Sequence, residues 1–304
     1  MKRPVHWRRL LRSLAESVLS IGPFHSALEH RLRGRSVVLA YHNVIPDDEP
    51  VSGDPGAHLR LGEFQKHLDF LSGRFQVVPL EEVFRPEPVD GPLRIAITFD
   101  DAYRGAILLG IPELTKRHLP ATVFVPTGLV GKGPFWWDEF EFSGWEGERI
   151  PLRRLQGYYP AVRAWALDSG WKARAQEPFQ VPASESELLT AARAAPAIRF
   201  GTHTVSHRNL SELSMHEIRQ ELQSSLKWLA KRSISPSPWL SYPYGLTALH
   251  VEAVAKENGL QGGLTITGGS VRPPLTNHFQ APRVNVPAGI SMRGLLLRVL
   301  GGTA

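Results

Sequence analysis

Cysteine is absent from the 304 residues of this chain. Disulfide bonds, thiol catalysis and cysteine-ligated metal sites are therefore excluded, and any metal site has to use His, Asp or Glu. Long apolar runs are also missing, because the stretch "LLRSLAESVLSIGPF" near the start is too short and too polar to span a bilayer. What the chain does have is a hydrophobic share of 42% and twelve histidines. At this length it can bury the core of one large α/β domain or two small ones.

Positive charge is concentrated at the beginning of the chain. Residues 1–35 hold eight Lys and Arg against two Glu, which accounts for the whole formal net charge of +6. The remainder is neutral overall, which argues against a nucleic-acid-binding protein. Arg12 and Glu16 interrupt the apolar stretch and no A-x-A pattern follows, so a signal peptide is disfavoured. Two alternatives stay open: a basic amphipathic helix in peripheral contact with an anionic membrane, or a solvated helix packed on the domain. If residues 1–35 form a membrane-contacting helix, we expect the protein in the cytoplasm or on the inner membrane face.

From residue 36 onward, apolar runs alternate with amphipathic segments. This alternation predicts parallel strands joined by crossover helices, but it does not say whether the sheet is open or closed. Residues 127–197 interrupt the alternation and are predicted to be an insertion that helps to build the site, and residues 291–304 a C-terminal tail or helix. Ser214 and Glu217 have the spacing of a capping box at a helix start. The predicted strands cover 36–42, 94–99, 121–126, 198–203, 239–243 and 262–267, and the predicted helices cover 61–75, 106–118, 214–232 and 247–259.

Chemically reactive side chains follow three of these strands. Asp100 and Asp101 come directly after an apolar strand, and two adjacent buried carboxylates need a cation or a shared proton. His203 and His207 follow a second strand, and the turn "SYPYG" (241–245) follows a third. Because the carboxyl ends of parallel strands share one edge, we expect these groups to meet there. One Asp and two His suit a divalent ion with open positions, and the other Asp is then free to act as a base.

Each of these signals has a simpler explanation when it is taken alone. An Asp pair at a strand end can cap the following helix, and either histidine by itself is more often structural. Their joint occurrence, in order and each at a strand end, favours a functional site.

The succession T-F-D-D, H-T-x-x-H and P-Y-G resembles the polysaccharide deacetylase family, the NodB-homology domain of carbohydrate esterase family 4. The likeness covers residues 36–290. The flanking stretches "VLAYHNV", "FQKHLDFL", "LPATVFV" and "APRVNV" are similar to the branch that acts on poly-N-acetylglucosamine and related exopolysaccharides. The resemblance implies an α/β fold, a distorted (β/α) barrel of seven or eight strands. It also implies metal-dependent removal of N-acetyl groups from an amino-sugar glycan, either a polysaccharide or a lipid-linked sugar.

Individual roles follow from the same resemblance. Asp100 corresponds to the general base, and Asp101, His203 and His207 to the ligands of one divalent metal ion. Zn²⁺ is favoured for that ion, and Co²⁺, Ni²⁺ or Fe²⁺ are compatible with the same ligands. A backbone N–H near Tyr244 corresponds to a donor for the tetrahedral oxyanion. The leaving amine requires a general acid.

The chain departs from the common family pattern in two places. It lacks the late L-x-H motif that carries the acid His, and its C-terminal part offers only His278. The exopolysaccharide branch has a rearranged order with this His on the first strand, a position that His42 fits; the alternative is a structural His. Ser241 and Tyr242 stand where the family often has an Arg that pairs with the base. Arg283 is the candidate replacement, and the alternative is an ordinary surface Arg.

Aromatic residues offer candidate contacts to sugar. Trp136, Trp137 and Trp239 can stack on pyranose rings, although aromatic residues more often belong to a core, and Asp138 is a candidate polar contact. Two other functions stay open. The first is hydrolysis of a small non-sugar amide at the same metal site. The second is carbohydrate binding without catalysis, since two family motifs are altered.

Overall fold

The computed structural model describes residues 32–86, 88, 91–140, 152–232, 234 and 236–301. The basic segment predicted over residues 1–35 lies outside the described residues except for its last four positions. Among the described helices, none combines the length and the apolar character that crossing a membrane requires.

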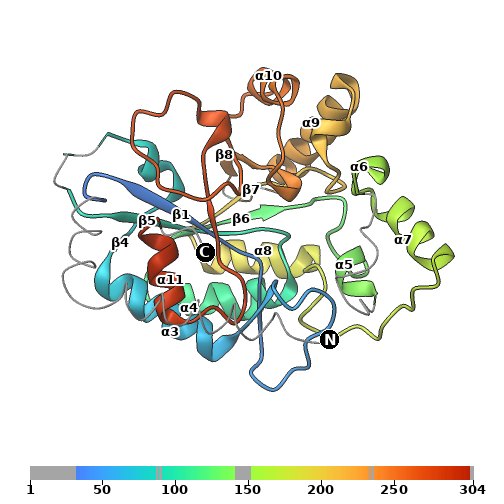
Figure 1. Cartoon of the computed structure of the whole chain (residues 1–304), viewed down its shortest axis with the longest axis horizontal. Helices are drawn as coiled ribbons and strands as arrows, with labels where there is room; N and C mark the ends of the chain where they lie inside the picture. Colours follow the sequence, from blue (N-terminus) through green and yellow to red (C-terminus); the bar gives the residue numbers. More distant parts are fainter. Residues whose placement is uncertain are drawn as a thin grey trace, which may run out of the picture.

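One parallel sheet forms the frame of the molecule (Figure 1). Its strands are β1 (Ser36–Tyr41), β4 (Gln76–Val77), β5 (Arg94–Phe99), β6 (Ala121–Val125), β7 (Ile198–Thr202), β8 (Pro236–Ser241), β9 (Gly262–Leu264) and β10 (Val284–Asn285). They follow the order β10-β1-β5-β6-β7-β8-β9, and β4 also pairs with β5. The short strands β2 (Asn43–Ile45) and β3 (His58–Arg60) form a separate parallel pair. The strands predicted from the alternation are therefore all present.

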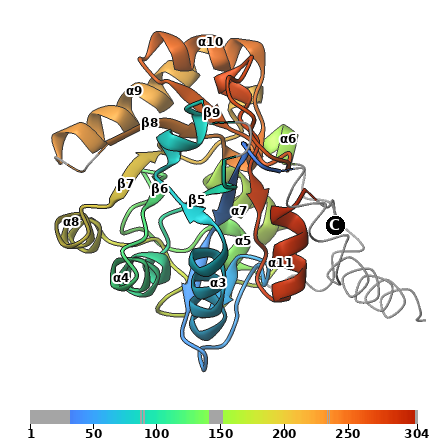
Figure 2. The same cartoon turned by 90° about the vertical axis from the view of Figure 1, so that its left-hand side faces the viewer.

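The sheet curls until its two edges meet. Ala281 forms a parallel bridge with Leu264 of β9, and the same segment continues into β10, which pairs with β1. The N–H of Thr265 donates to the carbonyl of Ala281 (2.9 Å), and the N–H of Ala281 donates to the carbonyl of Gly263 (3.0 Å). Figure 2 shows the strands at the centre with helices around them. The fold is thus a distorted (β/α) barrel, as the resemblance implied.

Helices cover the outside of the barrel (Figure 2). They are α3 (Leu61–Arg74), a π-helical turn η2 (Ala106–Gly110) that leads into α4 (Ile111–Lys116), α8 (Glu185–Ala194), α9 (Met215–Lys231), α10 (Leu249–Glu257) and α11 (Met292–Val299). The predicted capping box is confirmed, because Ser214 and Glu217 exchange side-chain and backbone hydrogen bonds at the start of α9. Short 3₁₀ turns complete the chain: η1 (Leu80–Phe84), η3 (Leu210–Glu212), η4 (Pro243–Gly245) and η5 (His278–Gln280).

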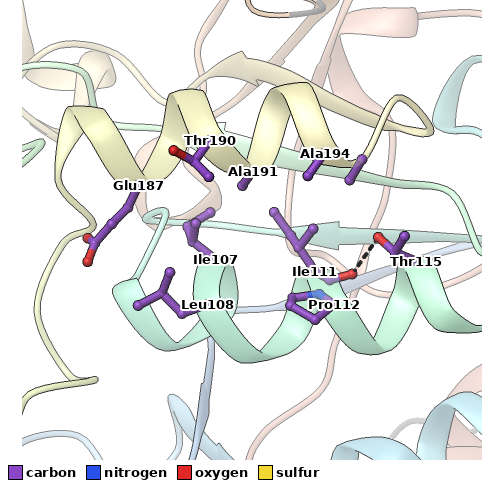
Figure 3. A pocket seen from close by; sticks show the side chains of 10 residues that line it. Ile107, Leu108, Ile111, Pro112, Thr115, Glu187, Thr190, Ala191 and Ala194 are labelled. Atoms are coloured by element: carbon purple, nitrogen blue, oxygen red, sulfur yellow. Dashed lines mark hydrogen bonds between the residues drawn. The ribbon is translucent and has the colours of Figure 1, made fainter.

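The interruption of the alternation is shorter than the predicted 127–197. Helices α5 (Trp136–Glu139), α6 (Leu152–Leu155) and α7 (Tyr159–Asp168) gather at one end of the molecule (right in Figure 1). Helix α8, however, is the crossover between β6 and β7, and its Leu188 is buried in the main core. An apolar groove runs between α8 and α4, and no residue of the predicted site lines it (Figure 3).

The two faces of the strands bury different side chains. The outer face packs against the helices, for example Leu39 and Ile97 with Phe64 of α3. The inner face forms a separate cluster inside the barrel, which contains Val38, Ala96, Phe124, Trp239 and Leu264. Glycine at position 201 makes room in this interior, since a Cβ there would lie 2.5 Å from the Phe124 ring.

Candidate metal and active site

Polar side chains complete the inner face of the barrel at the carboxyl ends of four strands. Side chains alternate along a strand, so every second residue after the apolar interior again points inward. On β1, β5, β7 and β8 these inner series end in His42, Asp100, His203 and Ser241. These four side chains, which we call the polar group, therefore lie directly above the apolar interior of the barrel.

Asp101, His203 and His207 form a compact group of potential metal ligands. One ligand atom from each lies within 4.8 Å of the others. Asp101 Oδ1 is 3.5 Å from His203 Nε2 and 3.3 Å from His207 Nε2, and it accepts no hydrogen bond from any described residue. Burial raises the pKa of Asp101, and Asp100 and Asp138 raise it further, so this carboxylate needs a positive partner to ionise. An unsatisfied buried carboxylate that faces two imidazoles fits a divalent cation.

The two imidazoles are in the form that binds a metal ion. His203 Nδ1 donates to the carbonyl of Ser241 at 2.7 Å, which leaves the Nε2 lone pair directed at Asp101. Burial lowers the pKa of His203 to about 4, although Asp100 opposes this shift. Burial, with His203 nearby, also lowers the pKa of His207 well below its usual range. Both rings are therefore neutral near pH 7.

The loops that carry these residues have an unusual backbone conformation. Five of the seven non-glycine residues with positive φ in the described part of the chain lie here. Such conformations cost about 1–3 kcal/mol each and occur preferentially at functional sites. The residues and their φ angles are Asp101 (68°), Ala102 (50°), Thr204 (68°), His207 (56°) and Tyr244 (60°).

Asp100 makes a bidentate ion pair with Arg283. The two terminal nitrogens of the guanidinium donate to Oδ1 at 2.8 Å and to Oδ2 at 2.7 Å, and also to Thr98 and Ser241. Arg283 is fully buried, so the alternative of an ordinary surface arginine is wrong. Burial alone would raise the pKa of Asp100, but the guanidinium and His203 outweigh it and hold this pKa below its usual value. Asp100 is therefore ionised throughout the neutral range.

His42 lies beside Asp100 at the end of the neighbouring strand. The N–H of Asp100 donates to the carbonyl of Tyr41 at 2.9 Å, and the β1–β5 register then places His42 next to Asp100. The ring is half-buried. Burial lowers the pKa of His42, whereas the Asp100 carboxylate raises it.

Tyr244 lies on the other side of the cluster. Its ring centroid is 4.9 Å from that of His207. The hydroxyl donates to the carbonyl of Gly157 and accepts from Trp136 Nε1, both at 3.3 Å. A Cβ at position 157 would lie 2.3 Å from this hydroxyl, and φ there is +65°, so the close approach requires glycine. The predicted Trp136 and Tyr244 thus contact each other.

Trp137 and Asp138 have different environments although they are adjacent in sequence. The Trp137 ring packs on His207 with a centroid distance of 5.0 Å. Asp138 is fully buried and accepts hydrogen bonds from Tyr103 and from His58. The prediction that Asp138 contacts substrate is therefore wrong, because other protein groups already occupy its carboxylate.

Trp239 belongs to the interior of the barrel. It is 2% exposed and stacks on Phe84 at 4.0 Å. Because it precedes Ser241 by two residues on the same inner face, it lies beneath the polar group. The prediction that Trp239 stacks on sugar is therefore wrong. His278 lies beside this ring, 6.2 Å from it, and not in the polar group.

Sequence reasoning missed Tyr158, in the turn between α6 and α7. Its side chain is 42% exposed and lies over the Arg208 guanidinium, 5.4 Å from the ring centroid. Arg208 directly follows His207, and the carbonyl of Gln156 accepts from the N–H of Asn209 at 2.7 Å, which fixes the turn against this loop. No motif marks Tyr158, so only the fold reveals that it is close to the cluster.

Comparisons with known proteins agree with the fold, a distorted (β/α) barrel with a cluster of potential metal ligands at one edge. The sequence profile of the family described as polysaccharide deacetylase matches residues 89–263, more than half of the chain. The chain therefore belongs to the polysaccharide deacetylase family. A sequence comparison with curated proteins finds no match.

Solved structures of deacetylases share the fold. A polysaccharide deacetylase from Bacillus cereus superposes with a TM-score of 0.62 at 16% identity, over 87% of this chain and 69% of that one. IcaB from Ammonifex degensii gives 0.60 at 18% identity, over 89% and 98%. The deacetylase PplD from Streptococcus pyogenes gives 0.60 at 16% identity, over 87% and 98%. At these identities the likeness establishes the barrel and nothing finer.

Proposed function

We propose that this chain is a metal-dependent hydrolase that removes N-acetyl groups from an amino-sugar glycan. The main support for this proposal is the arrangement of side chains at one edge of the barrel. There, an Asp/His/His cluster lies beside a second carboxylate that is ion-paired and therefore charged. Membership of the polysaccharide deacetylase family supplies the reaction class.

Asp101, His203 and His207 are the residues that would hold the ion. Zn²⁺ is favoured, and Co²⁺, Ni²⁺ or Fe²⁺ suit the same donor atoms. When bound, such an ion polarises the acetyl carbonyl and lowers the pKa of a water toward about 7. The unsatisfied Oδ1 of Asp101 and the neutral imidazoles support this assignment.

Asp100 is the proposed general base. It is ionised because Arg283 binds both carboxylate oxygens, so it can accept the proton of the attacking water. The same guanidinium fixes the direction of the carboxylate, which limits the motion that proton transfer would otherwise need. The C–N bond of the acetamide then breaks, and acetate and a free sugar amine are released.

His42 is the proposed general acid for the leaving amine. It borders Asp100 at the end of the next strand, so both groups can reach one bound acetamide. Because burial lowers the pKa of His42, its proton depends on the neighbouring Asp100 carboxylate. Activity should therefore fall as pH rises and His42 loses that proton. A backbone N–H near Tyr244, whose φ is 60°, is the proposed donor to the oxyanion.

The proposed substrate is an N-acetylated glycan, with poly-N-acetylglucosamine and a lipid-linked amino sugar as the specific candidates. The structures of IcaB and of PplD, the latter in complex with acetate, share the fold of this chain. Two aromatic side chains are available to sugar rings: Trp137 on His207, and the exposed Tyr158 over Arg208. We assign the second as a platform for a neighbouring sugar of the chain.

Peripheral contact with the inner face of an anionic membrane is proposed for residues 1–35. Eight basic residues in this segment supply the electrostatic attraction. We expect the full-length protein to pellet with vesicles that contain anionic lipid, and residues 36–304 to stay in the supernatant. Full-length protein that remains wholly in the supernatant would contradict this assignment.

Acetate release from a panel of substrates tests the proposed function. The panel contains N-acetylglucosamine oligomers, a lipid-linked N-acetylated sugar and small N-acetylated amines, each incubated with Zn²⁺-loaded protein. The proposal predicts turnover of the sugars and much slower turnover of the small amides. Faster turnover of the small amides would favour the non-sugar hydrolase. Binding of the oligomer by wild type and by Asp100→Asn, without any turnover, would favour a binding protein.

A further inference from the structure

His203 and His207 differ in the hydrogen bonding of Nδ1, the ring nitrogen that does not face Asp101. His203 Nδ1 has a hydrogen-bond acceptor, the carbonyl of Ser241 at 2.7 Å. His207 Nδ1 is buried and has no hydrogen-bond partner among the described residues. Metal-binding histidines almost always have such a partner, because it fixes the tautomer and the ring orientation. Some other contact must therefore orient His207.

Aromatic side chains pack around the His207 ring. Besides the His203 ring at 4.7 Å, the nearest ring centroids belong to Tyr244 at 4.9 Å and Trp137 at 5.0 Å, with Phe135 at 6.4 Å. Trp137 is itself stacked on Phe135, with centroids 4.7 Å apart and an interplanar angle of 4°. Contacts of this kind restrict a ring by shape, so the position of His207 depends on where the Trp137 ring is held.

A hydrogen bond to a buried tyrosine holds the Trp137 ring. Trp137 Nε1 donates to the hydroxyl of Tyr103 at 2.7 Å. That hydroxyl donates in turn to Asp138 Oδ2. Tyr103 and Asp138 are both fully buried, so water does not compete for these hydrogen bonds.

Asp138 is fixed from its other side by His58 and Asn43. The Oδ1 atom of Asn43 accepts from the N–H groups of Val44 (2.8 Å) and Ala106 (3.1 Å), so its Nδ2 must be the donor to His58 Nδ1 at 3.0 Å. His58 Nε2 then carries the proton and donates to Asp138 Oδ1 at 3.0 Å. Every member of the chain from Asn43 to Trp137 thus has a defined donor or acceptor role.

We propose that Tyr103 and Asp138 are positioning residues for His207 and that they act through the ring of Trp137. The buried chain replaces the missing hydrogen bond on His207 Nδ1 by holding an aromatic wall against the imidazole. This inference rests on the proposed function in one respect only, namely that His207 binds a metal ion.

Titration of metal-stripped protein with Co²⁺ tests the proposal, because the visible absorption of Co²⁺ reports its ligand geometry. Tyr103→Phe keeps the ring but removes the hydroxyl that Trp137 and Asp138 share. We expect about tenfold weaker Co²⁺ binding, a shifted absorption band, and a lower kcat at nearly constant KM. Tyr41→Phe is the matched control, since it removes another buried hydroxyl, the one 3.4 Å from His67.

A second variant separates positioning from general loss of stability. Trp137→Phe keeps an aromatic ring but removes the N–H that binds Tyr103, so it should reproduce the spectral shift of Tyr103→Phe. If both act on one element, the double variant should bind Co²⁺ no more weakly than the weaker single variant. This variant also serves if Tyr103→Phe does not fold.

The outcomes separate this inference from the proposed function. A wild-type protein that binds no Co²⁺ overturns the metal assignment and, with it, the positioning role. A wild type that binds Co²⁺, beside Tyr103→Phe and Trp137→Phe proteins with unchanged affinity and spectrum, overturns the positioning role alone. Additive effects in the double variant would also contradict a single chain of contacts.

Discussion

His203 and His207 face the same carboxylate, but different kinds of contact hold them. His203 belongs to a group held by charge and hydrogen bonds, which we call the ionic half of the site: Asp100, Arg283, Ser241 and His203. His207 belongs to a group held mainly by ring packing, which we call the aromatic half: His207, Trp137, Tyr244, Tyr103 and Asp138. One metal-binding cluster is thus built from two different kinds of support.

The difference has energetic consequences. In the ionic half, removal of one partner leaves a buried charge without compensation, which costs about 3–5 kcal/mol. In the aromatic half, each ring contact contributes only a small part of the stabilising energy. A single substitution there should therefore shift the geometry of the metal-binding cluster without abolishing it. We therefore expect abrupt losses from ionic substitutions and graded losses from aromatic ones.

Asp100→Asn should give the largest effect in the ionic half. The amide cannot accept the water proton, so kcat should fall about 1,000-fold, within the range for loss of a general base. Acetate release and the metal content per protein should be measured together. Metal content should not change, because Asp101 and the two histidines remain. An Asn variant that retains a tenth of wild-type activity would show that another group is the base.

His42→Gln should lower kcat about 100-fold, because the leaving amine then lacks a proton donor. The fall in rate with rising pH, which reports deprotonation of the acid, should disappear in a pH–rate profile of this variant. His216→Gln, at an exposed position of α9, is the control and should keep the wild-type profile. If the alkaline decline persists in His42→Gln, the acid is a different group.

Arg283→Met should destabilise the fold by about 3–5 kcal/mol, because the buried Asp100 loses its partner. The guanidinium lowers the pKa of Asp100, so its stabilising effect is present above the unfolded pKa of about 3.9 and is lost as pH falls through the folded value. Without Arg283 that pKa rises, and the rate should decline at a higher pH on the acid side. Urea denaturation and a pH–rate profile measure both effects.

Arg219→Met is the matched control for this variant. Arg219 also binds a carboxylate, at 2.9 Å from Glu257, but its side chain is 40% exposed. Exposed pairs contribute about 0–1 kcal/mol, so the control should unfold almost as the wild type does. Equal destabilisation of both variants would mean that the buried pair has no special role.

Tyr158→Ala should give the smallest effect, on substrate binding alone. Loss of a sugar-stacking ring costs about 0.5–1.5 kcal/mol, which corresponds to a rise in KM of about 2- to 12-fold. The rise should appear with N-acetylglucosamine oligomers and not with the single sugar. Leu167→Ala, with the same exposure of 42%, is the control on α7. A KM that does not change with oligomers would remove Tyr158 from the glycan site.

Much of the ionic half could be predicted from the sequence. Asp100 and His203 occur in short motifs after apolar strands, and strand alternation carries them to one edge of the sheet. The same motifs contain the other two potential metal ligands, Asp101 and His207. The contact of Arg283 with Asp100 was a weaker expectation, because the two residues are 183 positions apart and only closure of the barrel brings them together.

The aromatic half was less predictable for a physical reason. Its members are fixed by contacts between distant segments, such as His58 on β3 with Asp138 on α5, and neither residue lies in a periodic pattern. The sequence also does not indicate whether a tryptophan and an adjacent acidic residue are buried or exposed. That is why Asp138 was assigned to substrate although it is buried. Trp239, in the barrel interior, was assigned to substrate from its residue type alone, and it is buried as well.

Metal dependence of acetate release tests whether Asp101, His203 and His207 hold a catalytic metal ion. Protein stripped of metal should be titrated with Zn²⁺ on an N-acetylglucosamine oligomer, with acetate and new amine groups measured in parallel. We expect no release from the stripped protein, and equal yields of acetate and amine that rise until one Zn²⁺ is bound per chain. Full release by the stripped protein, or none with one Zn²⁺ bound, would contradict this expectation.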